Sequence, residues 1–409
     1  MTIDNANSAT IDMTEALAAE AQRRSPRDAA QLLAFSPAAI VVDVLQSLNP
    51  AVAMDILDEM PPERRGAILS AASSQQRAQW LRNDKYPEET IGRLMEPPTA
   101  VFRGTQTIAQ TIDRVRELSR TTIVTYAFIV DEVGRLCGVV TMRDLLLSAR
   151  EQRLDAVMLR DPFFLTPEME LPEAMKQVVR RHFPVYPVCE ADGTLIGQVR
   201  GQAMFEEQAY EISAQAGRMV GVDKEERLTT PWSRSLRFRH PWLQLNLLTA
   251  FIAAAVVGLF QGTIDRIVIL AAFLPVLAGQ SGNTGCQALA VALRGMTLGE
   301  LQPGRERALV MKEGLLGFLN GALVGVVAAI GMYVTARAQS HPAALLLAGI
   351  VFCSMIGSCI VSGISGALIP LTLRRLGADP ATASSIFLTT ATDVASMGLF
   401  LSLATMLVR

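Results

Sequence analysis

The sequence predicts a multidomain membrane protein in which an α-helical superhelix and an α/β domain pair precede a five-helix transmembrane domain. Charged residues are frequent in residues 1–240 and are confined to short gaps in residues 241–409. Near the N-terminus, short apolar segments alternate with prolines, a pattern typical of stacked short helices. Between these two regions, a strand–turn–strand pattern occurs twice, which indicates a repeated α/β unit.

The composition excludes several classes of function. The chain has 409 residues, which suits two or three domains, and its net charge of −2 lacks the basic surplus of nucleic-acid-binding proteins. The five cysteines form no Cys-x-x-Cys pair and the three histidines lie far apart, which gives no support to zinc or thiol chemistry. The first residues are polar and contain no apolar signal core, so we expect the N-terminus to stay in the cytoplasm.

Residues 1–27 are expected to form a flexible tail and residues 28–94 a helical N domain. In two places a capping residue precedes a proline at the first helical position. Apolar residues between the prolines suit one buried face, so we predict a small superhelix of stacked helix pairs. The prolines recur at steps of about twelve to thirteen residues, in Ser36-Pro37, Asn49-Pro50 and Pro61-Pro62.

Residues 95–202 form the predicted domain pair. The segment from Tyr126 to Val140 reads as strand, turn and strand, and the segment from Val185 to Val199 repeats it 59 residues later. A helical stretch precedes each pair of strands. A repeat of this length, with both strands and helices, predicts a tandem of two small α/β domains.

Residues 203–238 are expected to connect the soluble region to the membrane. We predict a helix over 203–228, with charges throughout that include Glu206, Glu207 and Glu211. A helix in this place can carry motion of the cytoplasmic region to the first span.

Residues 239–409 contain five apolar runs, each long enough to cross the hydrocarbon core as a helix of about 20 residues. A helix is required because lipid offers no partner for free backbone groups. Buried helices of a soluble protein usually have runs of about ten to fourteen residues, so five long runs argue against that alternative. The runs are 241–261, 266–293, 312–336, 343–372 and 381–408.

The basic residues predict the orientation. Arginine and lysine gather before the first span, between the second and third, and between the fourth and fifth. The opposite side holds Arg266, Arg337 and Arg409. Because positive residues concentrate in cytoplasmic loops, we expect a multi-pass protein of the cytoplasmic membrane with its N-terminus inside and its C-terminus outside.

The second span contains a polar stretch, Gly279–Gln287, that a lipid-facing helix would not tolerate. Asn283 and Gln287 are four residues apart and share one helix face. The glycines, which include Gly282 and Gly285, permit close backbone approach or a local break, and irregular backbone at this depth is acceptable only against protein or water. The alternative is helix packing through small residues, which does not account for the amide side chains.

The fifth span carries Asp393 about 18 Å along a helix that begins at Ala381. An ionisable group at that depth is costly and indicates a function by default. Ser385 and Thr389 fall near the same helix face and offer oxygen atoms next to the carboxylate. The alternative is a protonated Asp393 that neighbouring hydroxyl groups satisfy.

The polar side chains of these two spans present oxygen atoms, which are the preferred ligands of hard cations such as Mg²⁺ and Ca²⁺. One carboxylate per chain is a sparse site for a doubly charged ion, but a symmetric homodimer would place two Asp393 side chains around one axis. Mg²⁺ sheds water reluctantly, so a wide polar ring would suit the hydrated ion. We therefore predict a channel or transporter for a divalent cation, Mg²⁺ first, with metal contacts from Asp393, Thr389 and Asn283.

Several sequence motifs resemble those of one known family. The tandem unit is similar to a pair of cystathionine-β-synthase-type (CBS) domains, and the order of N domain, CBS pair, connecting helix and five spans resembles the MgtE family of magnesium channels. The resemblance covers almost the whole chain after about residue 28. The most specific matches are Arg239-His240-Pro241-Trp242-Leu243, Gly282-Asn283-Thr284-Gly285-Cys286-Gln287, Glu313 with Asn320-Gly321, Leu368-Ile369-Pro370, and Asp379-Pro380 through Thr389-Thr390-Ala391-Thr392-Asp393.

The resemblance implies a homodimeric Mg²⁺ channel whose pore follows the dimer axis. Asp393 matches the family's ion-selecting aspartate, and Asn283 lies on the matching pore-lining segment. In the family, Mg²⁺ held between acidic residues of the N domain, CBS pair and connecting helix closes the pore, because the cation neutralises their mutual repulsion. The remaining candidates are Ser385, Thr390, Gln287, Gly282 and Gly285 for the pore lining, and Glu206, Glu207 and Glu211 for regulation by Mg²⁺.

The two CBS units differ where relatives contact a nucleotide. The first unit has Thr141 and Asp144, which suit ribose and phosphate contacts. The second unit has neither residue in the corresponding Gly197–Ala203, so a bound nucleotide is doubtful. The following stretch lacks the dense acidic run usual in relatives, so we expect Mg²⁺ sensing to be weaker or differently placed.

Three alternatives stay open at this point. The cargo could be Co²⁺, Mn²⁺ or another divalent ion, because oxygen sites discriminate by geometry. A non-conducting membrane sensor would have little use for Asp393. An intramembrane enzyme would need a second catalytic group at matching depth, and the sequence shows none, so no enzymatic activity is predicted.

Overall fold

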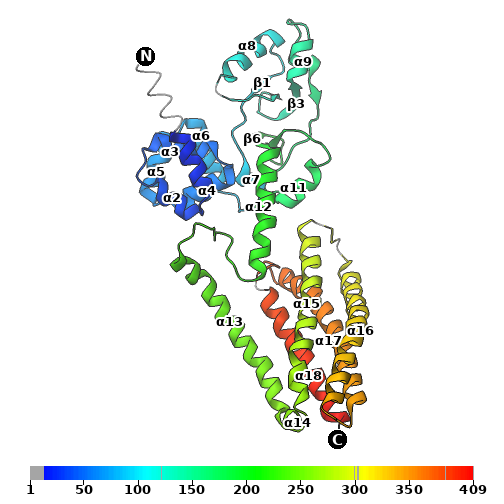
Figure 1. Ribbon diagram of the computed structural model, residues 1–409. Coiled ribbons are helices and arrows are strands. Elements are labelled where there is room, and N and C mark those ends of the chain that lie inside the picture. Colours follow the sequence, from blue (N-terminus) through cyan, green and yellow to red (C-terminus); the bar gives the residue numbers. More distant parts are fainter. Residues whose placement is uncertain (1–12, 121, 299, 302–303, 383, 409) are drawn as a thin grey trace. The chain divides into compact units, whose positions relative to one another are not determined.

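The computed structural model describes residues 13–120, 122–298, 300–301, 304–382 and 384–408 (Figure 1). The chain divides into two compact units. The first consists of Met1–Glu211 and Arg227–Thr230, and the second consists of Ile212–Glu226 and Pro231–Arg409.

The first unit begins with the predicted helical domain. A helix at 13–22 packs its Leu17, Ala18 and Ala21 onto the apolar core of this domain, so ordered packing starts before the predicted boundary at residue 28. The core also buries Leu33 and Met54 completely. The helices that follow are α2 (Pro26–Leu33), α3 (Ala38–Ser47), α4 (Pro50–Asp58), α5 (Pro62–Ala71), α6 (Ser74–Asn83) and α7 (Ile91–Leu94).

The predicted helix starts are correct at one proline and wrong at another. Asn49 is the N-cap of α4, and its side chain accepts a hydrogen bond from the backbone N–H of Ala51 at 3.1 Å, with Pro50 at the first helical position. At α3 the N-cap is Pro37, which has no side-chain acceptor, so Ser36 does not cap this helix. The helix therefore starts one residue later than the prediction requires.

Two similar strand pairs confirm the predicted α/β repeat. Strands β2 (Tyr126–Val130) and β3 (Leu136–Thr141) pair antiparallel, as do β5 (Val185–Cys189) and β6 (Leu195–Arg200). Each pair has a register shift near the end of its first strand, and each turn contains a glycine with positive φ. The first sheet has the order β1-β2-β3-β4, with β1 parallel to β2. The other elements are β1 (Val101–Arg103), α8 (Ile108–Leu118), α9 (Met142–Leu147), α10 (Leu154–Val157), β4 (Leu159–Arg160) and α11 (Leu171–Val178).

The connecting helix α12 (Gly201–Met219) is shorter than predicted. The expected helix over 203–228 ends at Met219, and residues 220–231 are not helical. Gly221 has a φ of 78°, a conformation that ends a helix and that favours glycine. The side chain of Trp242 also lies 2.8 Å from the position of a Cβ at Gly221, so a larger residue would not fit there.

Among its described residues the second unit has five long helices, which run for about 36 to 50 Å and exceed the thickness of a hydrocarbon core. Four of them, α13, α16, α17 and α18, are long and apolar enough to cross a membrane. The fifth, α15, has 29 residues and contains the polar stretch identified in the sequence. The elements are α13 (Trp232–Leu259), α14 (Gln261–Arg266), α15 (Ile269–Thr297), α16 (Glu306–Ala338), α17 (Ala344–Arg375) and α18 (Ser384–Leu407).

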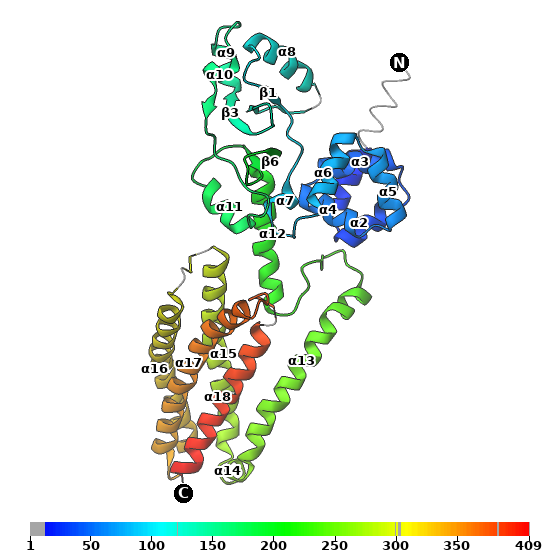
Figure 2. The ribbon, with the colours of Figure 1, turned by 180° about the vertical axis from the view of Figure 1, so that it is seen from behind.

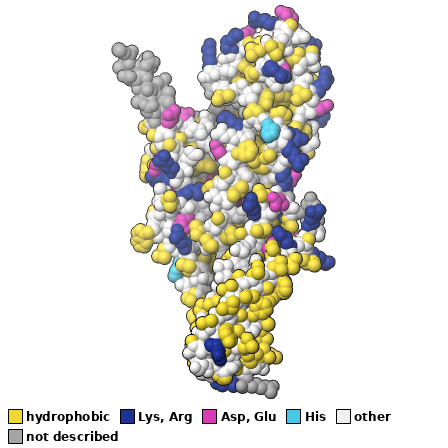
Figure 3. All heavy atoms as spheres, turned by 45° about the vertical axis from the view of Figure 1, so that its right-hand side comes forward, with side chains coloured by type: hydrophobic (Ala, Val, Ile, Leu, Met, Phe, Trp, Pro, Cys, Tyr) yellow, Lys and Arg dark blue, Asp and Glu magenta, His cyan; other side chains and the backbone are white. Residues whose placement is uncertain are grey.

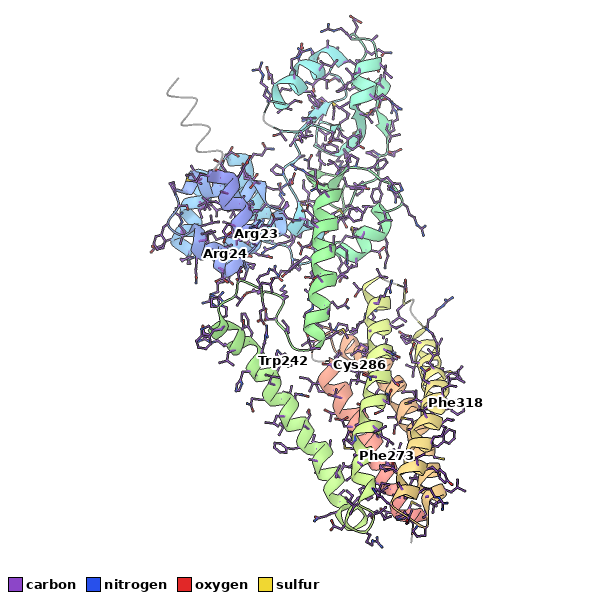
Figure 4. All side chains as sticks on the ribbon, in the orientation of Figure 1. Arg23, Arg24, Trp242, Phe273, Cys286 and Phe318 are labelled. Carbon is purple, nitrogen blue, oxygen red and sulfur yellow. The ribbon has the colours of Figure 1, made fainter. Side chains whose placement is uncertain are left out.

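Helix α17 is the centre of this bundle and packs against α15, α16 and α18. Gly317, Gly321 and Gly325 of α16 face α17 so closely that a Cβ at each would press against atoms of α17. Helix α13 contacts the bundle near its C-terminal end, where Ala253 is buried, and its other end diverges from the bundle (Figure 2). Hydrophobic side chains cover the face of the bundle in Figure 3, and Phe318 points outward from α16 in Figure 4.

Candidate functional site

Helix α15 presents a polar face on its exposed side. The helix is continuous, so the predicted polar stretch does not contain a local break. Gln280, Asn283 and Gln287 are exposed, whereas Ser281 and Gly285 on the other side of the helix are buried. Three amide side chains therefore project from a membrane-spanning bundle, where lipid would offer them no hydrogen-bond partner.

The two glycines that the sequence assigned to a pore have different surroundings. A Cβ at Gly282 would meet open space, so the packing of this chain does not require glycine there. Gly285 is buried between Leu388 of α18 and Gly366 of α17. Its position therefore supports helix packing rather than the predicted pore lining.

Helix α18 presents a carboxylate and two hydroxyl groups. Asp393 is partly exposed near the middle of the helix. The hydroxyl of Thr389 donates to the backbone oxygen of Ser385 at 2.9 Å, and that of Thr390 donates to Ile386 at 2.8 Å. Both hydroxyl oxygens keep lone pairs that can accept a hydrogen bond from the water shell of a hydrated ion or can contact the cation directly.

The contact between Gly285 and Leu388 allows depths to be compared. Helices α15 and α18 run antiparallel (Figures 1 and 2). The first turns of α15 share an apolar cluster with the last turns of α18, and the last turns of α15 share another with the first turns of α18. At a rise of about 1.5 Å per residue, Asp393 and Gln280 both lie about 7.5 Å from this contact in the same direction, and Asn283 lies about 3 Å from it. Gln280 was not among the predicted site residues, because its match in depth to Asp393 depends on how two distant helices pack.

The side chain of Ser385 makes a different contact from the one that the sequence predicts. Its hydroxyl donates to the backbone oxygen of Met219, the last residue of α12, instead of extending the oxygen-rich face around Asp393. No local pattern in the sequence indicates this contact, because the two residues are 166 positions apart. Two further pairs within the second unit hold the end of α12, Thr297 with Gln215 at 3.0 Å and Arg218 with Asp379 at 3.3 Å.

Models of known protein families match most of the chain. Residues 274–403, which contain Asn283 and Asp393, match the MgtE family, described as a divalent cation transporter. Residues 14–89 match the MgtE intracellular N domain, and residues 91–151 and 154–206 match the CBS domain. The chain belongs to the MgtE family.

Two sequence relatives agree with this assignment. The chain is 25% identical over 379 residues to the "Magnesium transporter MgtE" of Thermus thermophilus, which covers 90% of this chain and 79% of the relative. It is 28% identical over 341 residues to the "Magnesium transporter MgtE" of Bacillus subtilis, which covers 82% of this chain and 72% of the relative. The crystal structure of the cytosolic domain of the Mg²⁺ channel MgtE in complex with ATP matches 47% of this chain and 78% of that chain, at 23% identity and a TM-score of 0.42.

Membership of the MgtE family confirms two predictions. The family is one of divalent cation transporters, so the chain is not an enzyme. Together with its long apolar helices, membership also confirms that the chain is a multi-pass membrane protein.

The predicted regulatory residues of this MgtE chain lie on α12. Glu206 accepts hydrogen bonds from Gln202 at 2.9 Å and from Asn49 of the N domain at 3.4 Å. Glu207 and Glu211 also have interaction partners. Within the described ranges, no group of three or more His, Cys, Asp or Glu side chains is arranged to hold a metal ion. A regulatory Mg²⁺ site at these residues stays a prediction.

Thr141 and Asp144, the candidates for nucleotide contact, form a capping box at the start of α9. The Thr141 hydroxyl donates to the Asp144 carboxylate at 2.7 Å, and the backbone N–H of Asp144 donates back to the hydroxyl at 3.2 Å. The bond from Thr141 holds the pKa of Asp144 below its usual value. Helix capping accounts for both residues, and a nucleotide contact stays a prediction.

Proposed function

We propose that this chain carries Mg²⁺ into the cell as a symmetric dimer, along a path lined by α15 and α18 of both protomers. The observation that carries this proposal is Asp393, a partly exposed carboxylate in the middle of a membrane-spanning helix. A charge in that position is costly in lipid, so it indicates a wet surface. Asn283 and Gln280 lie at similar depth on the neighbouring helix and offer further oxygen atoms that Mg²⁺ and its water shell accept.

Two features of the protomer support a dimer. The polar face of α15 is exposed in the single chain, where it would face lipid. Helix α13 is largely uncovered, and its N-terminal end diverges from the bundle (Figure 2). A second copy that covers the polar face would place two Asp393 carboxylates on one axis and double the negative charge available to one cation.

The contacts of α12 support regulation by the soluble part of the chain. Helix α12 starts in the first unit and ends in the second, where its last residue, Met219, accepts a hydrogen bond from Ser385. A shift of α12 would therefore have to break contacts at the first turn of α18, the helix that carries Asp393. In this proposal the N-terminus is cytoplasmic and the C-terminus lies outside, as the distribution of arginine and lysine favours.

The test is ion flux into liposomes that contain the purified full chain. We expect Mg²⁺ flux from the native chain, and a loss of at least tenfold in Asp393→Asn, which keeps the size of the side chain and removes its charge. The matched control is Asp265→Asn, which removes an exposed carboxylate from α14, outside the proposed path, and should leave flux unchanged. Native flux in Asp393→Asn would refute the path, and Co²⁺ or Mn²⁺ flux without Mg²⁺ flux would refute the cargo.

A further inference from the structure

Helix α17 carries three buried hydroxyl groups. Ser354, Ser358 and Ser362 are 1%, 0% and 0% exposed. Within the part of the chain that the structure describes, none of their Oγ atoms has a hydrogen-bond partner. Because they are spaced by four residues, the three side chains lie on one face of the helix, in its central turns.

The neighbours of α17 show which way this face points. Gly357 faces Leu399 of α18, and Gly366 faces Gly285 of α15. At about 100° per residue, the three serines fall between these two directions on the helical wheel. Gly363, on the opposite side, faces the backbone of Glu313 in α16. The serine face therefore points to the junction of α15, α17 and α18.

The other two helices contribute hydroxyl groups to the same junction. Ser281 of α15 is one turn from Gly285, and Thr392 and Ser396 of α18 are one and two turns from Leu388, the residue that packs on Gly285. All three are 0% exposed. Each donates its proton to a carbonyl of its own helix, at 3.0 to 3.2 Å, so each keeps lone pairs that can only accept.

The junction thus contains three buried donors that lack acceptors and three buried acceptors with spare capacity. An unpaired hydroxyl is unfavourable in any protein interior, and within a membrane no bulk water can reach it from the sides. Buried polar groups of this kind are normally joined by ordered water, each molecule of which makes two to four hydrogen bonds.

We propose that the junction of α15, α17 and α18 binds a line of ordered water molecules inside each protomer, held by Ser354, Ser358 and Ser362. Successive serines are about 6 Å apart along the helix axis. Two hydrogen bonds of about 2.8 Å each reach at most about 5.6 Å, so two water molecules in succession would join the oxygens of neighbouring serines. The line would run for about 12 Å through the middle of α17. This line of water is separate from the proposed Mg²⁺ path. The path follows the exposed face that carries Asn283, whereas the water lies inside one protomer.

The rival arrangement leaves the junction dry. A serine in a helix can donate to the carbonyl four residues earlier, and this bond adds little or slightly destabilises the helix. Replacement of such a serine by alanine is then neutral or favourable. If Ser358 instead bridges two water molecules, its loss leaves both of them and the neighbouring serines short of a partner, and the protein becomes less stable.

The first measurement is the melting temperature of the full chain in lipid nanodiscs. We expect Ser358→Ala to melt lower than the native chain by about 2 °C or more. The matched control is Ser365→Ala, on the same helix at a partly exposed position, which should melt within 1 °C of the native chain, roughly the change expected for surface substitutions. A melting temperature of Ser358→Ala at or above that of the native chain overturns the proposal.

The second measurement detects the water directly. X-ray radiolysis in water enriched in ¹⁸O labels side chains that lie beside bound water. Met355, three residues before Ser358 and 0% exposed, should take up the label. Met332 of α16 is equally buried, belongs to the same apolar cluster and should stay unlabelled. Absence of label at Met355 overturns the proposal independently of the melting temperatures.

Discussion

The hydroxyl of Ser385, in the first turn of α18, donates a hydrogen bond to the backbone oxygen of Met219, the last residue of α12. The last carbonyls of a helix have no partner within the helix, so a side chain that bonds to one of them fixes the helix end. Met219 also packs beside Leu289, Leu293 and Leu388. The end of the connecting helix is thus held by the two helices that carry Asn283 and Asp393.

Removal of the Ser385 hydroxyl should weaken regulation and leave ion selection intact. Loss of one hydrogen bond costs about 1 kcal/mol, which shifts an equilibrium between held and released α12 about fivefold. We expect Ser385→Ala to require about fivefold more internal Mg²⁺ for half-inhibition of flux into liposomes. Thr372→Ala is the control, because its hydroxyl bonds to Leu368 within its own helix. An unchanged inhibition curve for Ser385→Ala would show that this contact does not take part in gating.

The parts of the fold that the sequence predicted depend on local patterns. The paired turns are an example: Asp131 accepts from the backbone of Val133 at 2.9 Å, and Asp192 accepts from Thr194 at 2.9 Å. Such aspartate turns, each with a glycine of positive φ nearby, can be recognised within a few residues. The membrane helices likewise follow from the length of each apolar run.

The candidate site was predictable only in part. Helical periodicity shows that Asn283 and Gln287 share a face, but it does not show whether that face is exposed. Gly285 belongs to the same polar stretch and is nevertheless buried, because Leu388 and Gly366 pack against it. The end of α12 also depends on a distant residue, since Trp242 fills the space beside Gly221. Contacts of this kind join helices that are far apart in the chain, so local sequence patterns do not predict them.

The close contact between α16 and α17 should not tolerate a methyl group. A Cβ at Gly317 would overlap the backbone of Cys359, so α16 would have to move. We expect Gly317→Ala to destabilise the chain by about 1 to 3 kcal/mol, as overpacking of a core does. Gly349→Ala is the matched control, because Gly349 lies in a helix with open space around it, and there alanine should be neutral or stabilising by about 0.5 kcal/mol. The melting temperatures of both variants in nanodiscs test the difference, and equal values would contradict it.

The N domain is joined to the start of the CBS region by a buried arginine. The Arg93 side chain is 7% exposed and contacts the carboxylates of Asp55 and Asp58 in α4. Replacement by methionine leaves two carboxylates, each 36% exposed, without this partner, so we expect a cost between that of a surface ion pair and that of a fully buried one, about 1 to 3 kcal/mol. We expect Arg93→Met to lower the melting temperature of the first unit clearly. Arg114→Met breaks the exposed pair with Glu117 and should cost less than about 0.5 kcal/mol. A similar effect of both substitutions would mean that Arg93 does not hold the two parts together.

Glu226 should make the stability of the second unit depend on pH in the acidic range. Its side chain is 4% exposed, and Arg239 of α13 donates two hydrogen bonds to its carboxylate, from Nε at 3.1 Å and from a terminal nitrogen at 2.5 Å. These bonds hold the pKa of Glu226 below its usual value. A carboxyl group whose pKa is lowered by folding stabilises the fold above its unfolded pKa of about 4.3, and this stabilisation disappears as the pH falls through the folded pKa.

The comparison of native chain and Glu226→Gln from pH 7 to pH 3.5 isolates this group from the other carboxylates. Above pH 5 the native chain should melt at the higher temperature, because glutamine cannot form the charged pair with Arg239. Below about pH 4.3 the difference between the two melting temperatures should shrink, since the carboxyl group becomes protonated first in the unfolded chain and then, at lower pH, in the folded chain. Glu132→Gln, at an exposed position of the first unit, should match the native chain throughout. A difference between the native chain and Glu226→Gln that stays constant down to pH 3.5 would show that the contribution of Glu226 comes from its shape rather than from its charge.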